Sequence, residues 1–284
     1  MQYTLNILGR LLDLSEPCVM GILNVTPDSF FAGSRRQTEE EIAQRTNEIV
    51  AQGGRIIDVG ACSTRPGSQA VSEQEEMERL RRALTIVRRE QPDAVVSVDT
   101  FRPDVARMAV EELGADIVND VSEGDEMMFR MVNRLRVPYI LMSVQPDLRG
   151  TLMAFAEKVE RLRAMGQKDI ILDPGFGFGK TLDENYRLMA VMDRLQVLGL
   201  PLLVGISRKS MIYKFLDTTP QEALNGTTVL NTVALMKGAS ILRVHDVREA
   251  VEAVRLVANL AEFRTAEYRN TGIPEFRKDV ISKN

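Results

Sequence analysis

Residues 169–181 read DIILDPGFGFGKT, a short apolar run followed by three glycines, a lysine and a threonine. A glycine-rich segment between a strand and a helix suggests a phosphate-binding loop. The P-loop pattern fails, because with Lys180 in place its first glycine must stand where the chain has Pro174. The dinucleotide pattern G-x-G-x-x-G fails as well, since its third glycine falls on Lys180. Spacing therefore excludes both nucleotide sites, and an ordinary glycine-rich turn or a different ligand site remains.

The run that ends at Asp173 is one of eight short β-rich apolar segments, each followed by a longer stretch with helical spacing. Eight such units within about 250 residues are typical of a (β/α)₈ TIM barrel. A doubly wound sheet is the alternative, but it carries its glycine pattern after the first strand, where this chain reads NVTPDSF. The predicted strands are 19–24, 55–60, 95–99, 116–120, 138–142, 169–173, 201–205 and 240–244.

The chain is expected to form a single α/β domain over residues 1–284, with its core at about 18–262, because no linker or repeat divides it. Residues 1–15 are expected to cap the barrel from below or to form a hairpin there, and the polar C-terminal tail is expected to fray. Two helix starts are predicted from Ser or Thr followed three residues later by Glu, namely Thr38 with Glu41 and Ser72 with Glu75.

Composition limits the possible partners. The 284 residues carry a net charge of -4, which gives no electrostatic footprint for nucleic acid or an anionic membrane, although a small anion can still bind locally. The two cysteines, Cys18 and Cys62, have no metal-ligand spacing, and the chain has one histidine. Neither a transmembrane helix nor a signal peptide can be drawn, so the expected location is the cytoplasm.

Polar residues stand at the ends of most predicted strands. In a barrel these ends meet at one mouth, where sites form, and a ring of polar groups there favours a ligand over isolated structural pairs. The ring consists of Asn24, Asp58, Asp99, Asn119, Asp120, Met142, Asp173, the segment GISRK, Arg243 and His245.

The ring divides into two chemical groups. Asp99, Asn119 and Asp173 can accept hydrogen bonds from a planar, guanidine-like heterocycle, and Lys209 can donate to it. Asn24, Arg243 and His245 suit an anion such as phosphate. A lone histidine is often structural, but His245 follows the eighth strand, where barrels frequently bind phosphate.

Several neighbouring residues have a more local interpretation. Lys180 and Thr181 are expected to serve the start of the next helix, and Asp246 to cap the helix that follows it. The loops after the first two strands are either ordinary surface turns or segments that close over a ligand. The residues expected to close are Thr26, Asp28, Ser29, Thr64 and Arg65.

Seven motifs, in order from about residue 18 to 260, resemble the dihydropteroate synthase family. They read GILNVTPDSF, STRPG, VDT, NDV, DPGFGFGKT, GISRKSMI and RVHDV. The resemblance implies a transferase that condenses 6-hydroxymethyl-7,8-dihydropterin pyrophosphate with p-aminobenzoate, gives dihydropteroate and pyrophosphate, and is the sulfonamide target. It also implies a homodimer, formed through late helices such as the run NGTTVLNTVALMKGA.

Carried over by position, the resemblance assigns each site residue. It implies a catalytic set of Asp99, Asp173, Lys209 and Arg243. The pterin is bound by Asp99, Asn119, Asp173 and Lys209, with Met142 lining the pocket. Pyrophosphate is bound by Asn24, Thr64, Arg243 and His245, with Asn24 as the ligand of Mg²⁺. The p-aminobenzoate side is formed by Phe30, Thr64, Arg65, Pro66, Phe178 and Ser207.

Three positions depart from the family pattern: Ala32 and Cys62 replace acidic residues, and Ser143 replaces a histidine. They lie in the loops and at the rim, while the pterin and pyrophosphate groups are intact. A pterin-binding paralogue without synthase activity therefore remains an alternative. A pterin-dependent methyltransferase is a weaker one, because it has no need for a pyrophosphate group or for the STRPG loop.

Overall fold

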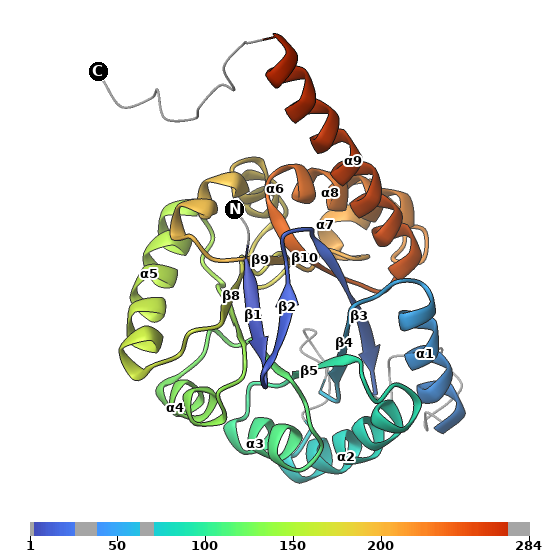
Figure 1. Cartoon of the computed structure of the whole chain (residues 1–284), viewed down its shortest axis with the longest axis vertical. Helices are drawn as coiled ribbons and strands as arrows, with labels where there is room; N and C mark the ends of the chain where they lie inside the picture. The colour runs from blue at the N-terminus through green and yellow to red at the C-terminus, as the bar shows by residue number, and fades with distance from the viewer. Residues whose placement is uncertain (1–2, 26–38, 63–70, 272–284) are drawn as a thin grey trace.

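A computed structural model describes residues 3–25, 39–62 and 71–271, and it contains a closed barrel of eight parallel strands. The strands run around the barrel in the order β10, β3, β4, β5, β6, β7, β8, β9, and helices surround them (Figure 1). The predicted TIM barrel is confirmed. Its strands are β3 (Cys18–Asn24), β4 (Ile56–Gly60), β5 (Val95–Asp99), β6 (Ile117–Asp120), β7 (Tyr139–Met142), β8 (Ile170–Asp173), β9 (Leu202–Val204) and β10 (Ala239–Val244).

The helices alternate with these strands, and the turn after β9 adds a short extra helix. They are α1 (Glu39–Ala51), α2 (Glu73–Glu90), α3 (Pro103–Glu111), α4 (Glu126–Leu135), α5 (Leu148–Met165), α6 (Leu182–Ala190), α7 (Ser210–Tyr213), α8 (Leu224–Met236) and α9 (Val247–Thr271), with a 3₁₀ helix, η1 (Met192–Leu198), after α6. In the described parts of the chain, no helix is long and apolar enough to span a membrane.

Both faces of each barrel strand are covered, which explains why the strands read as continuous apolar runs. Every residue of β4 is buried, because one face points into the barrel and the other packs against helices. Apolar side chains such as Val59 and Val98 belong to the layer between strands and helices, which forms the larger core. Polar residues inside these runs, such as Asp58, are therefore conspicuous.

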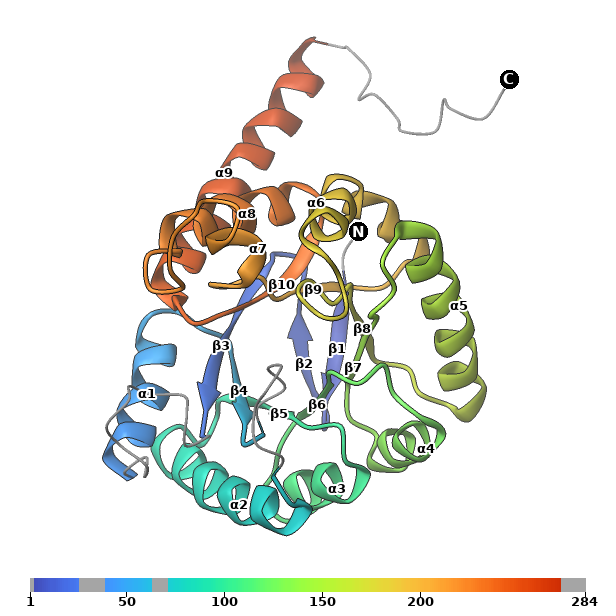
Figure 2. The same ribbon diagram turned by 180° about the vertical axis from the view of Figure 1, so that it is seen from behind.

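The N-terminal segment is a hairpin, as predicted, formed by β1 (Thr4–Ile7) and β2 (Arg10–Asp13). Its buried residues Leu5, Ile7 and Leu12 pack with early strand residues such as Ile56 and Ile171, so the hairpin closes the amino-terminal end of the barrel. It crosses the end nearer the viewer in Figure 1, and Figure 2 gives the opposite view. We call this covered end the plugged end, and the opposite end, where the carboxyl ends of the barrel strands lie, the mouth.

Local capping fixes several helix starts. Ser72 accepts a hydrogen bond from the backbone N–H of Glu75 at 3.2 Å, as predicted, while the Glu75 carboxylate pairs with Arg79. The other predicted cap, Thr38, lies outside the described residues, as does the C-terminal tail. Asp246 stands just before α9, but both of its carboxylate oxygens bind Arg208, at 2.9 and 2.8 Å. That ion pair replaces the predicted capping role.

Candidate functional site at the barrel mouth

The glycine-rich loop after β8 is built so that backbone can pack closely. Asp173 ends β8, and its Oδ1 accepts from the N–H of Gly175 at 2.8 Å. Gly175 has φ +68°, and a Cβ there would lie 2.1 Å from the carbonyl oxygen of Ser143. Gly177 has φ +82°, and a Cβ there would lie 2.9 Å from Cδ of Lys209. Glycine at 175 therefore lets the loop lie against the loop after β7, and glycine at 177 lets it lie against Lys209, which follows β9.

The two residues that suggested a nucleotide loop have structural roles. Thr181 caps α6 and forms a capping box with Glu184, as predicted for the start of a helix. The ammonium of Lys180 donates to the carbonyl oxygens of Ser143, Gly175 and Phe178 at 3.0, 3.1 and 3.4 Å. Lys180 thus ties the glycine-rich loop to the loop after β7, a role that its sequence position did not indicate.

Lys180→Met is expected to lower the free energy of unfolding by about 2 kcal/mol, because it leaves carbonyl groups without their charged donor. Chemical denaturation measures this change. Lys168→Met is the matched control, since Lys168 is exposed and stands on the connection before β8. Equal unfolding free energies for the two variants would show that Lys180 does not brace the loop.

Lys209 is one of the cations at the mouth. Its ammonium donates to the carbonyl oxygen of Phe176 at 2.5 Å and lies 4.3 Å from the ring centroid of Phe178. Burial lowers the pKa of Lys209 to about 8, against the opposing charge of Asp173. Burial likewise raises the pKa of Asp173, against the opposing effect of Lys209. Asp173 is buried and Lys209 is partly buried, and their opposite charges interact near the ends of β8 and β9.

Arg243 lies between two carboxylates. Its Nε donates to Asp58 and its Nη2 donates to Asp99, both at 2.6 Å. Burial raises the pKa of Asp99 to about 7; Arg243 opposes the rise and Asp58 adds to it. Although burial acts to lower the pKa of Arg243, the two carboxylates raise it above its ordinary value. Arg243 therefore stays cationic, and Asp99 is the carboxylate that titrates near neutral pH.

Asp58 joins the two predicted subsites. Its carboxylate accepts from Nδ2 of Asn119 at 3.2 Å as well as from Arg243. Asp58 was in the predicted ring but was given no function, and no local pattern reveals its partners. The one available signal was a carboxylate within the apolar run RIIDVG. Asp120 follows Asn119 on β6, and because side chains alternate along a strand it points to the other face. Its carboxylate accepts from the Tyr139 hydroxyl at 2.7 Å.

His245, after β10, contacts Ser207, after β9, at the mouth. Nδ1 of His245 and Oγ of Ser207 lie 3.1 Å apart, and the same hydroxyl accepts from the His245 backbone N–H at 3.1 Å. Arg45 of α1 donates to the His245 carbonyl at 2.6 Å. These contacts fix the loop after β10. The contributions of Arg45 and of the pair between Arg208 and Asp246 were not predicted.

A glycine separates two polar residues at the rim between β3 and β5. Asn24, Gly60, Asp99 and Asn119 are successive partners across β3, β4, β5 and β6. A Cβ on Gly60 would lie 3.3 Å from Oδ1 of Asn24 and 3.4 Å from Cβ of Asp99. Glycine at position 60 therefore lets Asn24 and Asp99 pack closely over the strand between them.

The structure brings most of the predicted residues to one end of the barrel. Asp58, Asp99, Asn119 and Arg243 form a hydrogen-bonded cluster, and Asp173 and Lys209 interact electrostatically beside it, with Phe178 next to Lys209. Met142 is buried against the glycine-rich loop. The predictions for Thr26, Asp28, Ser29, Phe30, Ala32, Thr64, Arg65 and Pro66 lie outside the described residues.

Two of the departures from the family pattern can be placed. Ser143 is buried, and its hydroxyl accepts from the N–H of Gln145 at 3.3 Å while its carbonyl accepts from Lys180. Cys62 is partly exposed at the start of the second loop, and burial raises the pKa of its thiol. Neither residue interrupts the contacts of the polar cluster.

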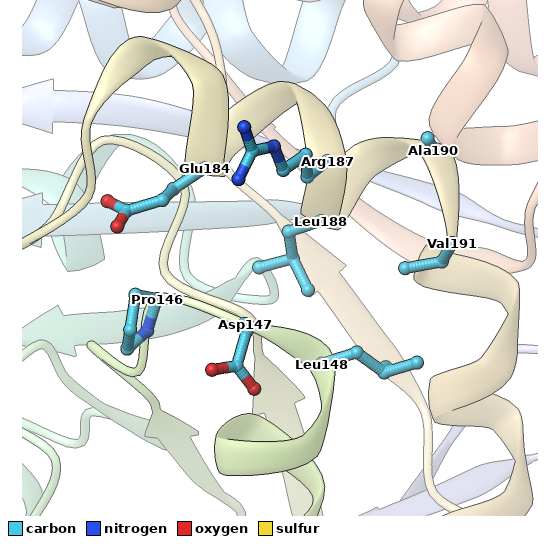
Figure 3. Close-up of a pocket in the computed structure, with 8 residues that line it drawn as sticks. All are labelled: Pro146, Asp147, Leu148, Glu184, Arg187, Leu188, Ala190 and Val191. Atoms are coloured by element: carbon cyan, nitrogen blue, oxygen red, sulfur yellow. The ribbon is translucent and has the colours of Figure 1, made fainter.

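A surface groove of about 500 Å³ lies elsewhere, between the start of α5 and helix α6 (Figure 3). Its walls include Pro146, Leu148, Leu188 and Val191, and it contains none of the predicted site residues. Within the described residues, no three His, Cys, Asp or Glu side chains are grouped to hold a metal ion. The polar cluster at the mouth is therefore the candidate site.

The pattern of the family "Pterin binding enzyme" matches residues 20–245, so the barrel that carries this cluster is that of a pterin-binding enzyme. Within that class the chain belongs to the dihydropteroate synthase family, whose members are transferases of folate biosynthesis. It is 40% identical to the synthase of Escherichia coli (strain K12) over 265 residues, which cover 88% of this chain and 93% of the relative. Identity to the Streptococcus pyogenes synthase is 38%, over 89% of this chain and 99% of the relative.

Solved structures of dihydropteroate synthases are also similar to this chain. A Xanthomonas albilineans dihydropteroate synthase with 4-aminobenzoic acid matches with a TM-score of 0.86 and 34% identity, covering 92% of this chain and 99% of that one. A Yersinia pestis dihydropteroate synthase in a sulfonamide drug complex matches with a TM-score of 0.85 and 37% identity, covering 92% and 100%.

Proposed function

We propose that this protein condenses 6-hydroxymethyl-7,8-dihydropterin pyrophosphate with p-aminobenzoate and releases pyrophosphate. The observation that carries the proposal is the hydrogen-bonded cluster at the barrel mouth, in which Arg243 links Asp58 and Asp99, with Asp173 and Lys209 near enough to shift each other's pKa. Family membership supplies the substrate class. The cluster supplies both a set of acceptors for a heterocycle and a fixed cation for an anion.

The pterin is proposed to bind between the carboxylates. Asp99 and Asp173 accept from its ring and amino N–H groups, Asn119 adds an amide, and Lys209 donates to a ring acceptor. Met142 and Phe178 contribute the apolar surface. As positive charge develops on the pterin methylene, the two carboxylates stabilise it, because fixed charges act strongly in a buried site.

The pyrophosphate is proposed to bind Arg243, His245, Asn24 and Thr64. Arg243 keeps its charge at all working pH values, so it can hold the leaving group in both the bound and the departing state. His245 is oriented by Ser207, which fixes the ring beside the loop that follows β10. No residue of this cluster needs to form a covalent intermediate, since the aniline nitrogen attacks the pterin methylene directly.

A magnesium ion is proposed to accompany the pyrophosphate, held on the protein side by Asn24. Mg²⁺ keeps several waters and is usually bound through one or two protein oxygens together with substrate phosphates. The amide oxygen of Asn24, which lies next to Gly60 at the end of β3, can supply one such oxygen. When bound, the ion would neutralise charge on the leaving pyrophosphate.

The p-aminobenzoate is proposed to enter beside Phe178 and Ser207. The remaining residues assigned to it, Phe30, Thr64, Arg65 and Pro66, belong to the first two loops. Phe178 supports this placement, because its ring lies against the Lys209 ammonium and so borders the pterin side of the mouth.

The deciding experiment measures pyrophosphate release from the pterin substrate with Mg²⁺, with and without p-aminobenzoate, together with dihydropteroate formation. We expect product that depends on the aniline, and loss of turnover in Asp99→Asn and Arg243→Met. Tight pterin binding without turnover would favour the paralogue without synthase activity. Methyl transfer in place of pyrophosphate release would favour the methyltransferase alternative.

We also propose that the protein is a cytoplasmic homodimer. Helices α8 and α9 pack against each other and expose apolar side chains. These are Val229, Met236, Leu256, Leu260 and Phe263. Both cysteines are free, which suits a reducing compartment. Sedimentation of the wild type and of Leu260→Glu tests the dimer, and a wild type that sediments as a monomer would refute it.

A further inference from the structure

Asp58 connects three strands that are not neighbours. It belongs to β4, has no exposed surface, and binds Arg243 of β10 and Asn119 of β6. In the barrel order these are alternate strands, and alternate strands contribute side chains to one layer of a barrel interior. Asp58 therefore lies in the layer that supports both the proposed pyrophosphate arginine and the proposed pterin amide.

We propose that Asp58 is a positioning residue for the reaction, which sets the orientation of the Asn119 amide and of the Arg243 guanidinium at the same time. This inference rests on the proposed function, because it assigns Asn119 to the pterin and Arg243 to the pyrophosphate. Asp58 itself is buried beneath these side chains and is not assigned any contact with a substrate.

The first consequence concerns Asn119. A carboxylate that already accepts from a guanidinium offers only acceptor atoms, so the Asn119 amide must turn its Nδ2 towards Asp58. Its Oδ1 then points the other way and can only accept. The Oδ1 is thereby placed to accept from an N–H group of the heterocycle, although an asparagine without this contact could turn either end of its amide to the ligand.

The second consequence concerns Arg243. Asp58 binds Nε, whereas Asp99 binds the terminal nitrogen Nη2. Held by Nε, the planar guanidinium cannot rotate, and its terminal nitrogens stay on the side of the mouth. Asp58 also provides Arg243 with a permanent counter-ion, so that Asp99 can exchange its contact with Arg243 for one with the pterin without leaving the arginine unpaired.

The test uses Asp58→Asn, which has nearly the same shape but no charge, so that Asn119 can bind it in either orientation. Calorimetry is performed with two probes: 6-hydroxymethylpterin, which lacks the diphosphate, and inorganic pyrophosphate with Mg²⁺. We expect about tenfold weaker binding of each probe, equivalent to about 1.4 kcal/mol. A purely structural role would lower the melting temperature and leave the affinities of the folded protein unchanged.

The matched control is Asp116→Asn. Asp116 is also a buried aspartate that binds an arginine, Arg88, at 2.8 Å, but it precedes β6 at the plugged end of the barrel. We expect this variant to lose stability and to bind both probes like the wild type. A double-mutant cycle adds a direct readout: in an Asn119→Ala background, Asp58→Asn should cost little further pterin affinity.

The outcomes distinguish a failure of the role assigned to Asp58 from a failure of the proposed function. A folded Asp58→Asn protein that binds both probes as tightly as the wild type would overturn this inference and leave the proposed function intact. A wild type that binds neither probe would overturn the proposed function, and this inference with it. If Asp58→Asn does not fold, Asp58→Asn/Arg243→Gln removes the unpaired guanidinium. Its pterin affinity should then be about tenfold below that of Arg243→Gln alone.

Discussion

Arg243→Lys is expected to lower kcat/KM for the pterin substrate by about 10²- to 10³-fold, the usual effect of removing one fixed electrostatic donor from an active site. Lysine keeps the positive charge but has a single ammonium, so it cannot bind Asp58 through an inner nitrogen and present a terminal fork to pyrophosphate. Because the charge is the same in both proteins, the loss of kcat/KM would measure the contribution of the guanidinium geometry. Steady-state kinetics of pyrophosphate release measure it.

The control for this prediction is Arg88→Lys. Arg88 is also a partly buried arginine, paired with the buried Asp116, but it lies at the end of α2 near the plugged end. We expect it to lower stability and to leave kcat/KM within about threefold of the wild type, because breaking a pair far from the mouth leaves the fixed charges of the site in place. Wild-type kinetics in Arg243→Lys would contradict the role assigned to Arg243.

Lys209→Met is expected to lower kcat/KM by about 100-fold and to change the pH profile. Hydrogen bonds from a charged donor contribute about 1.5–3 kcal/mol, which gives the size of the loss. In the wild type, the pKa of Lys209 is about 8, so its cation disappears as the pH rises through 8 and activity should fall there. The pKa of Asp99 is about 7, so activity should also fall as the pH drops through 7.

In the pH–activity profile, Lys209→Met should keep the fall in activity at low pH and lose the fall at high pH. Burial lowers the pKa of Lys180 to about 8 as well, so a fall at high pH that persists in Lys209→Met would belong to Lys180 and refute the assignment. Lys237→Met is the matched control. Its ammonium also binds a carbonyl, that of Ala190 at 2.6 Å, but it lies just after α8, before β10 begins. We expect its pH profile to match that of the wild type.

Features that depend on local spacing could be predicted from the sequence. The alternation of apolar runs and helical stretches predicted the barrel, because burial on both faces of a parallel strand leaves a continuous apolar signature. Thr181 was predicted to start a helix, since a capping box involves residues only three positions apart. The strand-end residues could be grouped because all carboxyl ends of a parallel barrel meet at one mouth.

Features that depend on contacts distant in sequence were decided by the tertiary structure. Asp58 and Arg243 are 185 residues apart, and no local pattern reveals that they pair. The three carbonyl partners of Lys180 include Ser143, which reaches it only because β7 and β8 are neighbours. The sequence by itself determined the architecture and the chemical types at the mouth. Only the closed barrel determined that Asp58 and Asp99 both bind Arg243 and that the pKa of Asp99 is raised, because these properties follow from distance and burial.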